Sequence, residues 1–335
     1  MNMTLKRIGC CIIFSLLAAC FLIGCNSKHS NETDTEINKE IDNDKDNSSN
    51  QQPPIKAEVI TMTPVPTQEA TEVDQDNVSK REPTTEIVDY ERYFNQIEGC
   101  AVFYDVNNES YYIYNEELSL RQVSPCSTFK IISGLVGLDQ EVIASEDSTM
   151  GYDGTVYKRE GWNQDLSFRE AFQNSCVWYF RKVIDQIGEA QMQAALDLLN
   201  YGNHDISEWK GSWINSSPEL NGFWIESSLK ISPLEQVRVL TDIFEEKTPY
   251  SKEDIEILIN VMLTEEMDSG RIYGKTGTGI NSNGWFVGFM EQEAGKIYFA
   301  VYLEDKNIEN ISGKTAREIA IRILQEEYNE KHFID

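Results

Sequence analysis

A change in composition near residue 88 limits what this chain can fold into. Residues 26–88 are dominated by Asn, Asp, Glu, Ser, Thr, Gln and Pro, and they contain no aromatic residue. Such a segment cannot bury enough apolar surface to offset the entropy lost on ordering. We therefore predict a disordered acidic tether over residues 25–88, with a spacer role preferred over a binding role. The remaining residues, 89–335, are enough for one large domain or two small ones.

The first 24 residues predict an export signal. Lys6 and Arg7 precede an apolar run, Ile12 to Ile23, that is too short to indicate a membrane span. The run ends in the letters LIGC, which resemble the lipobox of bacterial lipoproteins. That resemblance implies cleavage before Cys25, lipidation of its thiol and an anchor on the extracytoplasmic face of the cell membrane. An uncleaved anchor helix is the alternative, and in both cases the chain leaves the cytoplasm.

Charge and cysteine content exclude several classes of function. The formal net charge of −27 argues against nucleic acid as a partner. Of the seven cysteines, Cys100, Cys126 and Cys176 lie in the body of the chain, and an odd number does not form a disulfide framework. The sequence has neither a CxxC pair nor a Cys/His cluster, so no metal site is predicted.

The pattern after residue 88 predicts strands at both ends and helices between them. Residues 100–117 alternate apolar and polar side chains around Asn107-Asn108, which indicates a hairpin. Residues 125–265 carry apolar side chains mostly at helical spacing. Three strand-like runs and an amphipathic helix follow, at residues 271–279, 284–292, 296–305 and 313–330. We predict an α/β fold of the α+β type, with an antiparallel sheet built from both termini and packed against helices.

A serine and a lysine stand three residues apart in SPCSTFK, residues 124–130. On a helix this spacing puts Ser127 and Lys130 on one face, with Cβ atoms roughly 5–6 Å apart. Pro125 suits a first turn, so Ser127 is expected at a helix N-terminus, where free amides favour negative charge. A serine nucleophile needs a base, and a lysine buried among apolar residues can be neutral. The alternative is a capping serine followed by a solvated lysine.

The histidines give little support to a Ser-His-Asp triad. His29 lies in the tether and His332 near the tail, which leaves His204 in the body. A serine enzyme built from this chain would therefore need a lysine base.

Two further segments place polar groups where chemistry is possible. Ser175 in NSCVWYF is flanked by bulky apolar residues, and a buried hydroxyl needs a partner. In YGKTGTG, Lys275 and Thr276 precede Gly277, which allows close approach to the backbone, and such an edge can hold a carboxylate. A phosphate-binding loop is excluded because GxxxxGK[ST] is absent. The alternatives are a serine bonded to its own helix turn and an ordinary strand end.

Four motifs in order resemble those of the class D, oxacillinase-type, serine β-lactamases. They are Ser-Thr-Phe-Lys, Ser-Cys-Val, Tyr-Gly-Asn and Lys-Thr-Gly, at residues 127–130, 175–177, 201–203 and 275–277. FQNSCVWYF, FWIESSLKIS and GWFVGF agree as well, so the resemblance covers about residues 90–330. It implies a β-lactamase/transpeptidase-like catalytic domain over residues 89–335. It also implies hydrolysis of penicillin-type antibiotics through a serine acyl-enzyme, which gives antibiotic resistance.

The resemblance further implies a role for each matching residue. Ser127 would attack the lactam carbonyl, and Ser175 would relay a proton to the leaving nitrogen. Lys130 would carry a carbamate derived from CO2 and act as the general base, with the Trp224 indole holding that group. No other cofactor is implied. Trp224 has core packing beside Phe223 as its alternative.

Other matching residues would bind the substrate. The backbone amides of Ser127 and Thr278 would form the oxyanion hole, where one donor can contribute about 3–4 kcal/mol. The groups implied to contact the β-lactam are Lys275, Val177, Thr276, Gly277 and Arg317. Lys275, Thr276 and Arg317 would receive its carboxylate, and a surface arginine on the last helix is the alternative for Arg317.

The chain departs from the family pattern in two places. Residues 204–223 are longer than the usual segment, and their Trp209 and Trp213 put the shape of the cleft mouth, and so the substrate range, in doubt. Cys126 and Cys176 adjoin two catalytic motifs, and we expect both to be small core residues.

Three other functions compete with hydrolysis. A penicillin-sensing domain shares this fold and motif set but stays acylated. Such domains normally belong to multi-span receptors with a cytoplasmic signalling part, whereas the membrane element expected here is a removable leader. Trp224 and the lipid tether favour turnover. A transpeptidase usually has Ser-x-Asn where this chain has Ser175-Cys176-Val177. A lipid-anchored substrate-binding or adhesion protein fits the leader and tether, but it does not explain Lys-Thr-Gly after Ser-Thr-Phe-Lys.

Overall fold

The computed structural model describes residues 82–280, 282–305, 307–308 and 310–329. The predicted signal peptide, the lipidation site Cys25 and the tether up to residue 81 lie outside these residues. Within the described part of the chain, no helix combines the length and the apolar character that crossing a bilayer requires.

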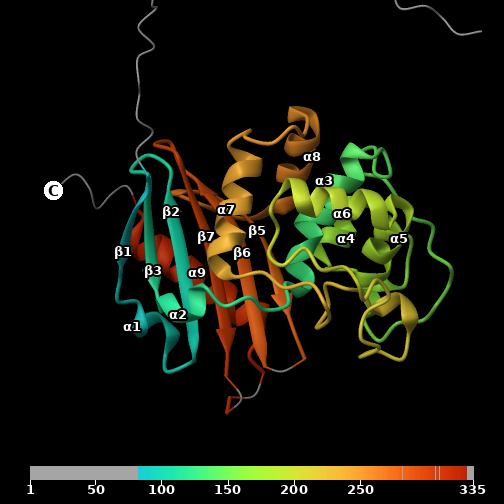
Figure 1. Cartoon of the computed structure of the whole chain (residues 1–335), viewed down its shortest axis with the longest axis horizontal. Helices are drawn as coiled ribbons and strands as arrows, with labels where there is room; N and C mark the ends of the chain where they lie inside the picture. Colours follow the sequence, from blue (N-terminus) through green and yellow to red (C-terminus); the bar gives the residue numbers. More distant parts are fainter. Residues whose placement is uncertain (1–81, 281, 306, 309, 330–335) are drawn as a thin grey trace, which may run out of the picture. The chain divides into compact units, whose positions relative to one another are not determined.

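Strands from the two ends of the described region form one sheet (Figure 1). Its order is β1-β3-β2-β7-β6-β5-β4. The strands are β1 (Thr84–Ile87), β2 (Gly99–Asp105), β3 (Ser110–Tyr114), β4 (Leu263–Met267), β5 (Gly270–Thr278), β6 (Asn283–Glu291) and β7 (Lys296–Glu304). Early strand β2 pairs antiparallel with late strand β7, which confirms the predicted sheet from both termini. The edge pair β1–β3 is the exception, because it is parallel.

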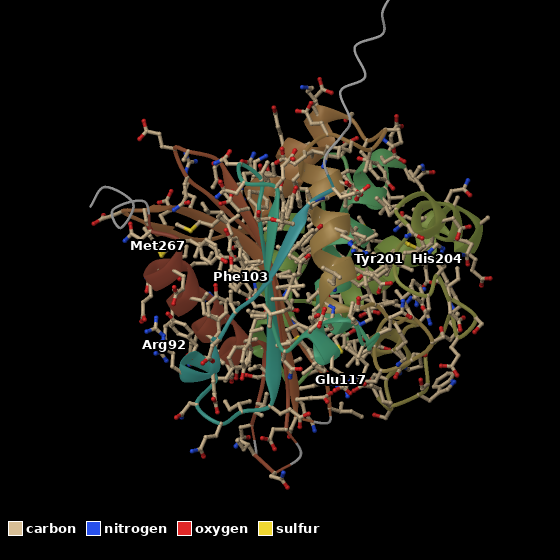
Figure 2. The ribbon with its side chains drawn as sticks, turned by 60° about the vertical axis from the view of Figure 1, so that its left-hand side comes forward. Arg92, Phe103, Glu117, Tyr201, His204 and Met267 are labelled. Atoms are coloured by element: carbon tan, nitrogen blue, oxygen red, sulfur yellow. The ribbon has the colours of Figure 1, made fainter. Side chains whose placement is uncertain are left out.

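Helices cover both faces of the sheet (Figure 1). The helices are α1 (Glu91–Phe94), α2 (Glu116–Ser119), α3 (Lys130–Asp139), α4 (Phe168–Gln173), α5 (Val177–Ile187), α6 (Glu189–Leu198), α7 (Pro233–Phe244), α8 (Lys252–Met262) and α9 (Gly313–Glu327), with 3-10 turns η1 (Cys126–Phe129), η2 (Glu160–Trp162) and η3 (Pro218–Leu220). Figure 2 shows Phe103 in the sheet, Arg92 and Met267 to one side, and Tyr201 and His204 on the side of α3–α8.

Because both faces are covered, the central strands have two buried sides. In β7, Tyr298, Ala300 and Tyr302 face the core shared with α3–α8, whereas Phe299 and Val301 face the core shared with α1 and α9. Successive side chains of a strand point to opposite faces, so this strand is apolar throughout rather than alternating.

The structure corrects two predicted boundaries. The tether predicted over 25–88 ends too late, because residues 84–87 form β1, a fully exposed edge strand paired with β3. The helical region predicted to extend to residue 265 ends too late as well, because β4 begins at Leu263. Both strands are short, polar and at an edge of the sheet, so neither shows the apolar pattern by which a strand is recognised.

Candidate active site

The predicted nucleophile and base meet where η1 continues into α3. Ser127 lies in the 3-10 turn and Lys130 is the first residue of α3. The Lys130 ammonium nitrogen, Nζ, is 2.9 Å from Ser127 Oγ. The turn is fixed by Thr128, whose backbone N–H and hydroxyl both donate to the Pro125 carbonyl, at 3.2 and 2.7 Å. Cys126, just before the serine, has a positive φ of 50°, a conformation that persists only where its surroundings impose it.

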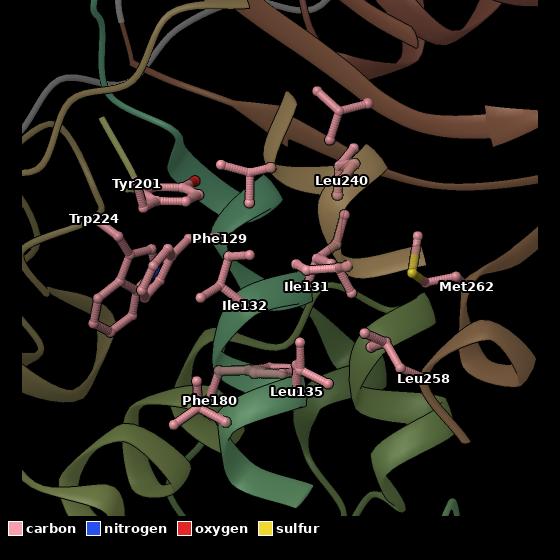
Figure 3. Packing of buried hydrophobic residues seen from close by; sticks show 14 of the residues in the cluster. Phe129, Ile131, Ile132, Leu135, Phe180, Tyr201, Trp224, Leu240, Leu258 and Met262 are labelled. Carbon is pink, nitrogen blue, oxygen red and sulfur yellow. The ribbon is translucent and has the colours of Figure 1, made fainter. Parts of the chain in front are cut away.

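Lys130 is completely buried, with no exposed surface. Its Nζ lies 5.5 Å from the centre of the Phe180 ring. Figure 3 shows the core around α3, in which Ile132, Phe180 and Leu258 pack together from α3, α5 and α8. Burial lowers the pKa of Lys130 to about 7; the thiols of Cys176 and Cys126 oppose this change, and the charge of Arg159 adds to it. The solvated lysine considered as the alternative is therefore excluded. At neutral pH this amine is about half neutral, as a base requires.

Ser175 occupies the turn between α4 and α5 rather than the interior of a helix. It is half-buried and has a positive φ of 54°. Its N–H donates to the Phe172 carbonyl at 3.1 Å. From the other side, the Trp162 indole donates to the Asn174 carbonyl at 3.1 Å, which ties η2 to this turn. Val177, the next predicted contact residue, begins α5 and is half-buried.

The last part of β5 brings the Lys-Thr-Gly motif against η1. Strand β4 pairs with β5 only as far as Tyr273, so Lys275, Thr276 and Gly277 continue past it. A Cβ at Gly277 would stand 3.1 Å from the Pro125 carbonyl oxygen and 3.2 Å from Thr128 Cγ2. Glycine fits here without displacing η1, whereas a side chain would have to push the turn away from the strand. The first and the last motif, far apart in sequence, thus meet in the fold.

Lys275 is the second buried lysine of the site. Its Nζ donates to the Thr276 carbonyl at 2.9 Å and lies 3.4 Å from Thr276 Oγ1. Burial, and then the charges of Lys130 and Arg159, hold the pKa of Lys275 well below its ordinary value. The two amines therefore disfavour each other's protonation. An anion arriving between them would favour the ammonium form of Lys275.

Thr278, the predicted second oxyanion donor, ends β5 and is exposed. Its hydroxyl accepts a hydrogen bond from the Gly313 N–H at 2.9 Å, which attaches the start of α9 to the strand. The role predicted for the amides of Ser127 and Thr278 stays a prediction.

Trp224 lies fully buried beside Phe129 (Figure 3). Its ring and that of Phe129 have centroids 6.0 Å apart and planes inclined by 29°. Its backbone carbonyl accepts from the Ser124 hydroxyl at 3.0 Å, which links the Trp224 loop to the start of η1. Trp224 is thus part of the core and packs beside Phe223, with ring centroids 5.1 Å apart, as its alternative expected.

The long segment 204–223 is anchored by one of its two tryptophans. Trp209 stacks on Phe223, with centroids 5.1 Å apart, and the Arg181 guanidinium lies 5.0 Å from the centre of the Trp209 ring. Trp213 is 65% exposed. Arg181 also lies 5.2 Å from the Trp224 ring, and it is buried and paired with Asp185 at 2.6 Å. Arg181 could not be found from the sequence, because an arginine in an amphipathic helix is normally solvated.

Arg317 reaches the Lys275 side of the site from α9. A cavity of about 340 Å³ is lined by Arg317 together with Lys275, Thr276 and Thr264. The guanidinium forms an ion pair with Glu265, at 2.6 Å between Nη2 and Oε2. The structure therefore brings all three predicted carboxylate-binding residues to one cavity. Glu265 and Arg159 are the charged neighbours that the sequence did not indicate, since they stand outside the recognisable motifs.

The cysteines are free and buried, as expected for small core residues. Cys126 Sγ lies 3.8 Å from Ser124 Oγ and 3.9 Å from Glu226 Oε1. Burial raises the pKa of the Cys126 thiol to about 12 and that of Cys176 to about 11. Across the described residues, no group of three or more His, Cys, Asp or Glu side chains is arranged to hold a metal ion.

Comparison with known proteins defines the class first. Residues 99–325 match the family described as the penicillin binding protein transpeptidase domain, and the chain belongs to this family. Within it, the predicted resemblance to class D β-lactamases is confirmed. The probable β-lactamase YbxI of Bacillus subtilis is 34% identical over 234 residues, which cover 69% of this chain and 82% of that protein.

Sensor proteins are similarly related. The regulatory protein BlaR1 of Staphylococcus aureus is 37% identical over 245 residues, which cover 72% of this chain. The match spans only 40% of BlaR1.

Among solved structures, the class D β-lactamase from Bacillus subtilis matches with a TM-score of 0.65 and 32% identity, over 72% of this chain and 97% of that one. The predicted β-lactamase/transpeptidase-like fold is therefore confirmed.

Proposed function

We propose that this protein hydrolyses the β-lactam ring of penicillin-type antibiotics through an acyl-enzyme on Ser127. One observation carries the proposal: the Ser127 hydroxyl is 2.9 Å from the amine of a fully buried lysine. Burial lowers the pKa of that amine to about 7, so much of it is neutral at physiological pH and able to accept a proton. The class D relatives support β-lactams as substrates.

In the acylation step, Ser127 Oγ forms a bond to the lactam carbonyl carbon while its proton passes to Lys130. The C–N bond of the lactam then breaks, and its nitrogen takes up a proton through Ser175. The amides of Ser127 and Thr278 stabilise the negative charge on the carbonyl oxygen, at about 3–4 kcal/mol per donor. Water completes the cycle by hydrolysing the ester, which frees Ser127.

The surroundings of Lys130 fit a carbamate formed with CO2. Only a neutral amine reacts with CO2, and the pKa of about 7 supplies one. The charge of Arg159, which disfavours an ammonium at Lys130, favours an anion in the same place. The Ser127 hydroxyl and the Trp224 indole would hold the group through hydrogen bonds. When bound, it supplies a carboxylate base for the attacking water.

The carboxylate of the β-lactam is received on the other side of the site. Lys275, Thr276 and Arg317 line one cavity, and two of them are cationic or become so when an anion arrives. Val177 and Gly277 would contact the rest of the β-lactam. A lipid anchor at Cys25 and export to the extracytoplasmic face of the membrane complete the proposal, and they rest on the leader sequence alone.

A penicillin sensor is the second candidate, because BlaR1 of Staphylococcus aureus is 37% identical to this chain. A sensor uses the same acylation step but keeps the acyl group. The two functions therefore differ only in whether water reaches the ester with a base beside it. Lys130, buried and 2.9 Å from Ser127, supports acylation in both candidates, so it is the class D relatives and not this contact that favour hydrolysis.

Steady-state hydrolysis of a chromogenic cephalosporin by the purified protein tests the proposal. We expect many turnovers per molecule for the wild type and none for Ser127→Ala. Ser133→Ala is the matched control, since this buried serine of α3 bonds only to its own helix turn, at the Phe129 carbonyl. A burst of one equivalent of product without further turnover would show that the protein is a penicillin sensor and not a hydrolase. No reaction at all would refute both functions.

A further inference from the structure

The arginine that faces the proposed substrate carboxylate already has a carboxylate partner in its own chain. Arg317 Nη2 donates to Glu265 Oε2 at 2.6 Å and to the Thr264 carbonyl at 3.2 Å. The two side chains are 36% and 37% exposed. A pair this exposed is screened by solvent and contributes little to the stability of the fold. The stability of the fold therefore does not explain why Arg317 and Glu265 form this ion pair.

A β-bulge in β4 directs this contact. The register of β4 against β5 shifts between Leu263 and Glu265, which leaves Thr264 as the extra residue. Bulges commonly re-aim the side chains beside them. The Thr264 hydroxyl donates to the Met262 carbonyl at 3.0 Å, while its own carbonyl faces Arg317. The distortion thus presents two acceptors, one neutral and one charged, to the same guanidinium nitrogen.

Arg317 keeps donors for a second anion. Its Nε is buried and has no hydrogen-bond partner among the described residues. The cavity beside it is lined by Lys275, Thr276 and Thr264, whereas Glu265 stands outside that lining. A buried donor without a partner is unfavourable, so an anion in the cavity would satisfy it. Glu265 and the substrate carboxylate would then share one guanidinium.

We infer that Glu265 sets the affinity of the site for the carboxylate of a β-lactam. It holds the Arg317 guanidinium in place, and its negative charge weakens the attraction of that guanidinium for a second anion. This inference rests on the proposed function and adds a residue that determines specificity. Removing the charge while keeping the acceptor should strengthen binding of an anionic substrate by about three- to fivefold, the range of a screened surface pair.

The test compares Glu265→Gln with the wild type by acylation with a fluorescent penicillin and with the methyl ester of the same compound. For the free acid we expect the acylation efficiency of the variant to rise about three- to fivefold at low salt, and to fall more steeply with added NaCl. For the ester, which lacks the carboxylate, we expect no change. Glu266→Gln is the matched control, because this exposed neighbour on β4 has the same charge, and among the described residues Arg317 forms its ion pair with Glu265 and not with Glu266.

The outcomes separate this inference from the proposed function. A wild type that neither compound acylates would refute the proposed function and the inference with it. A wild type that is acylated, with Glu265→Gln equal to or slower than Glu266→Gln on the free acid, would overturn the inference alone. An equal change for acid and ester would also overturn it, because a structural role affects both. If Glu265→Gln does not fold, the salt dependence of wild-type acylation by the free acid is the test. A strong dependence would refute the claim that Glu265 weakens the attraction of Arg317 for an anion.

Discussion

Replacing Lys130 by methionine should stabilise the protein while it removes activity. The Lys130 side chain is fully buried, and burial lowers its pKa from 10.5 to about 7. Folding at neutral pH therefore has to strip a proton from this amine or bury its charge. Methionine keeps an unbranched stem in the same space and carries no charge.

The size of the effect follows from the two pKa values. Their difference of 3.5 corresponds to about 5 kcal/mol at pH values below 7. The variant loses the hydrogen bond to Ser127, worth about 1 kcal/mol. We therefore expect a net gain of about 3–4 kcal/mol below pH 7, or a rise in Tm of roughly 6–15 °C.

The gain should depend on pH in a defined direction. Between pH 7 and 10.5 the unfolded chain binds a proton at Lys130 that the folded chain does not, so the stability of the wild type rises with pH. The advantage of Lys130→Met should therefore be largest below pH 7 and disappear near pH 10.5. Thermal unfolding of both proteins in CO2-free buffer across this range is the assay, with Lys158→Met, an exposed lysine, as control. A destabilised variant, or an advantage that does not change with pH, would refute a buried neutral lysine.

Three further predictions concern the reaction. The acylation efficiency of the wild type, measured by stopped flow, should rise about tenfold per pH unit below pH 7 and level off above it, because the base is the neutral form of Lys130; a flat profile would exclude that base. Added bicarbonate should increase the turnover of the wild type at pH 7, and a turnover that does not respond to bicarbonate would exclude a carbamate on Lys130. Gly277→Ala should lower acylation at least tenfold in the same assay, because the new Cβ would press on the Pro125 carbonyl 3.1 Å away; wild-type rates would show that η1 and β5 need not be so close.

Motifs with a local physical signature could be located from the sequence. Ser127 and Lys130 were predicted on one face of a turn because a spacing of three residues and an apolar run fix that geometry. The hairpin at Asn107-Asn108 and the strands after residue 270 follow from alternation and turn residues. The approach of the Lys-Thr-Gly strand to the turn that carries Ser127 was implied only by the resemblance to a family, because spacing alone does not say which strand packs against which turn.

Features that depend on tertiary contact could not be found this way. Edge strand β1, Thr84–Ile87, is exposed along its whole length and has one apolar residue, Ile87, so its sequence resembles the tether before it. Arg181 and Glu265 are ordinary charged residues in the sequence. They acquire their roles only because Trp209 folds back over Arg181, and because a bulge in β4 turns Glu265 toward α9.

Intact-mass spectrometry during a reaction with excess benzylpenicillin tests the central claim most directly. If Ser127 and Lys130 act together in a complete cycle, the protein gains the mass of one penicillin molecule, consumes the excess and returns to its original mass. Ser127→Ala should show no added mass at any time. An adduct that persists after the free penicillin has stopped changing would contradict hydrolysis and leave a receptor that only binds.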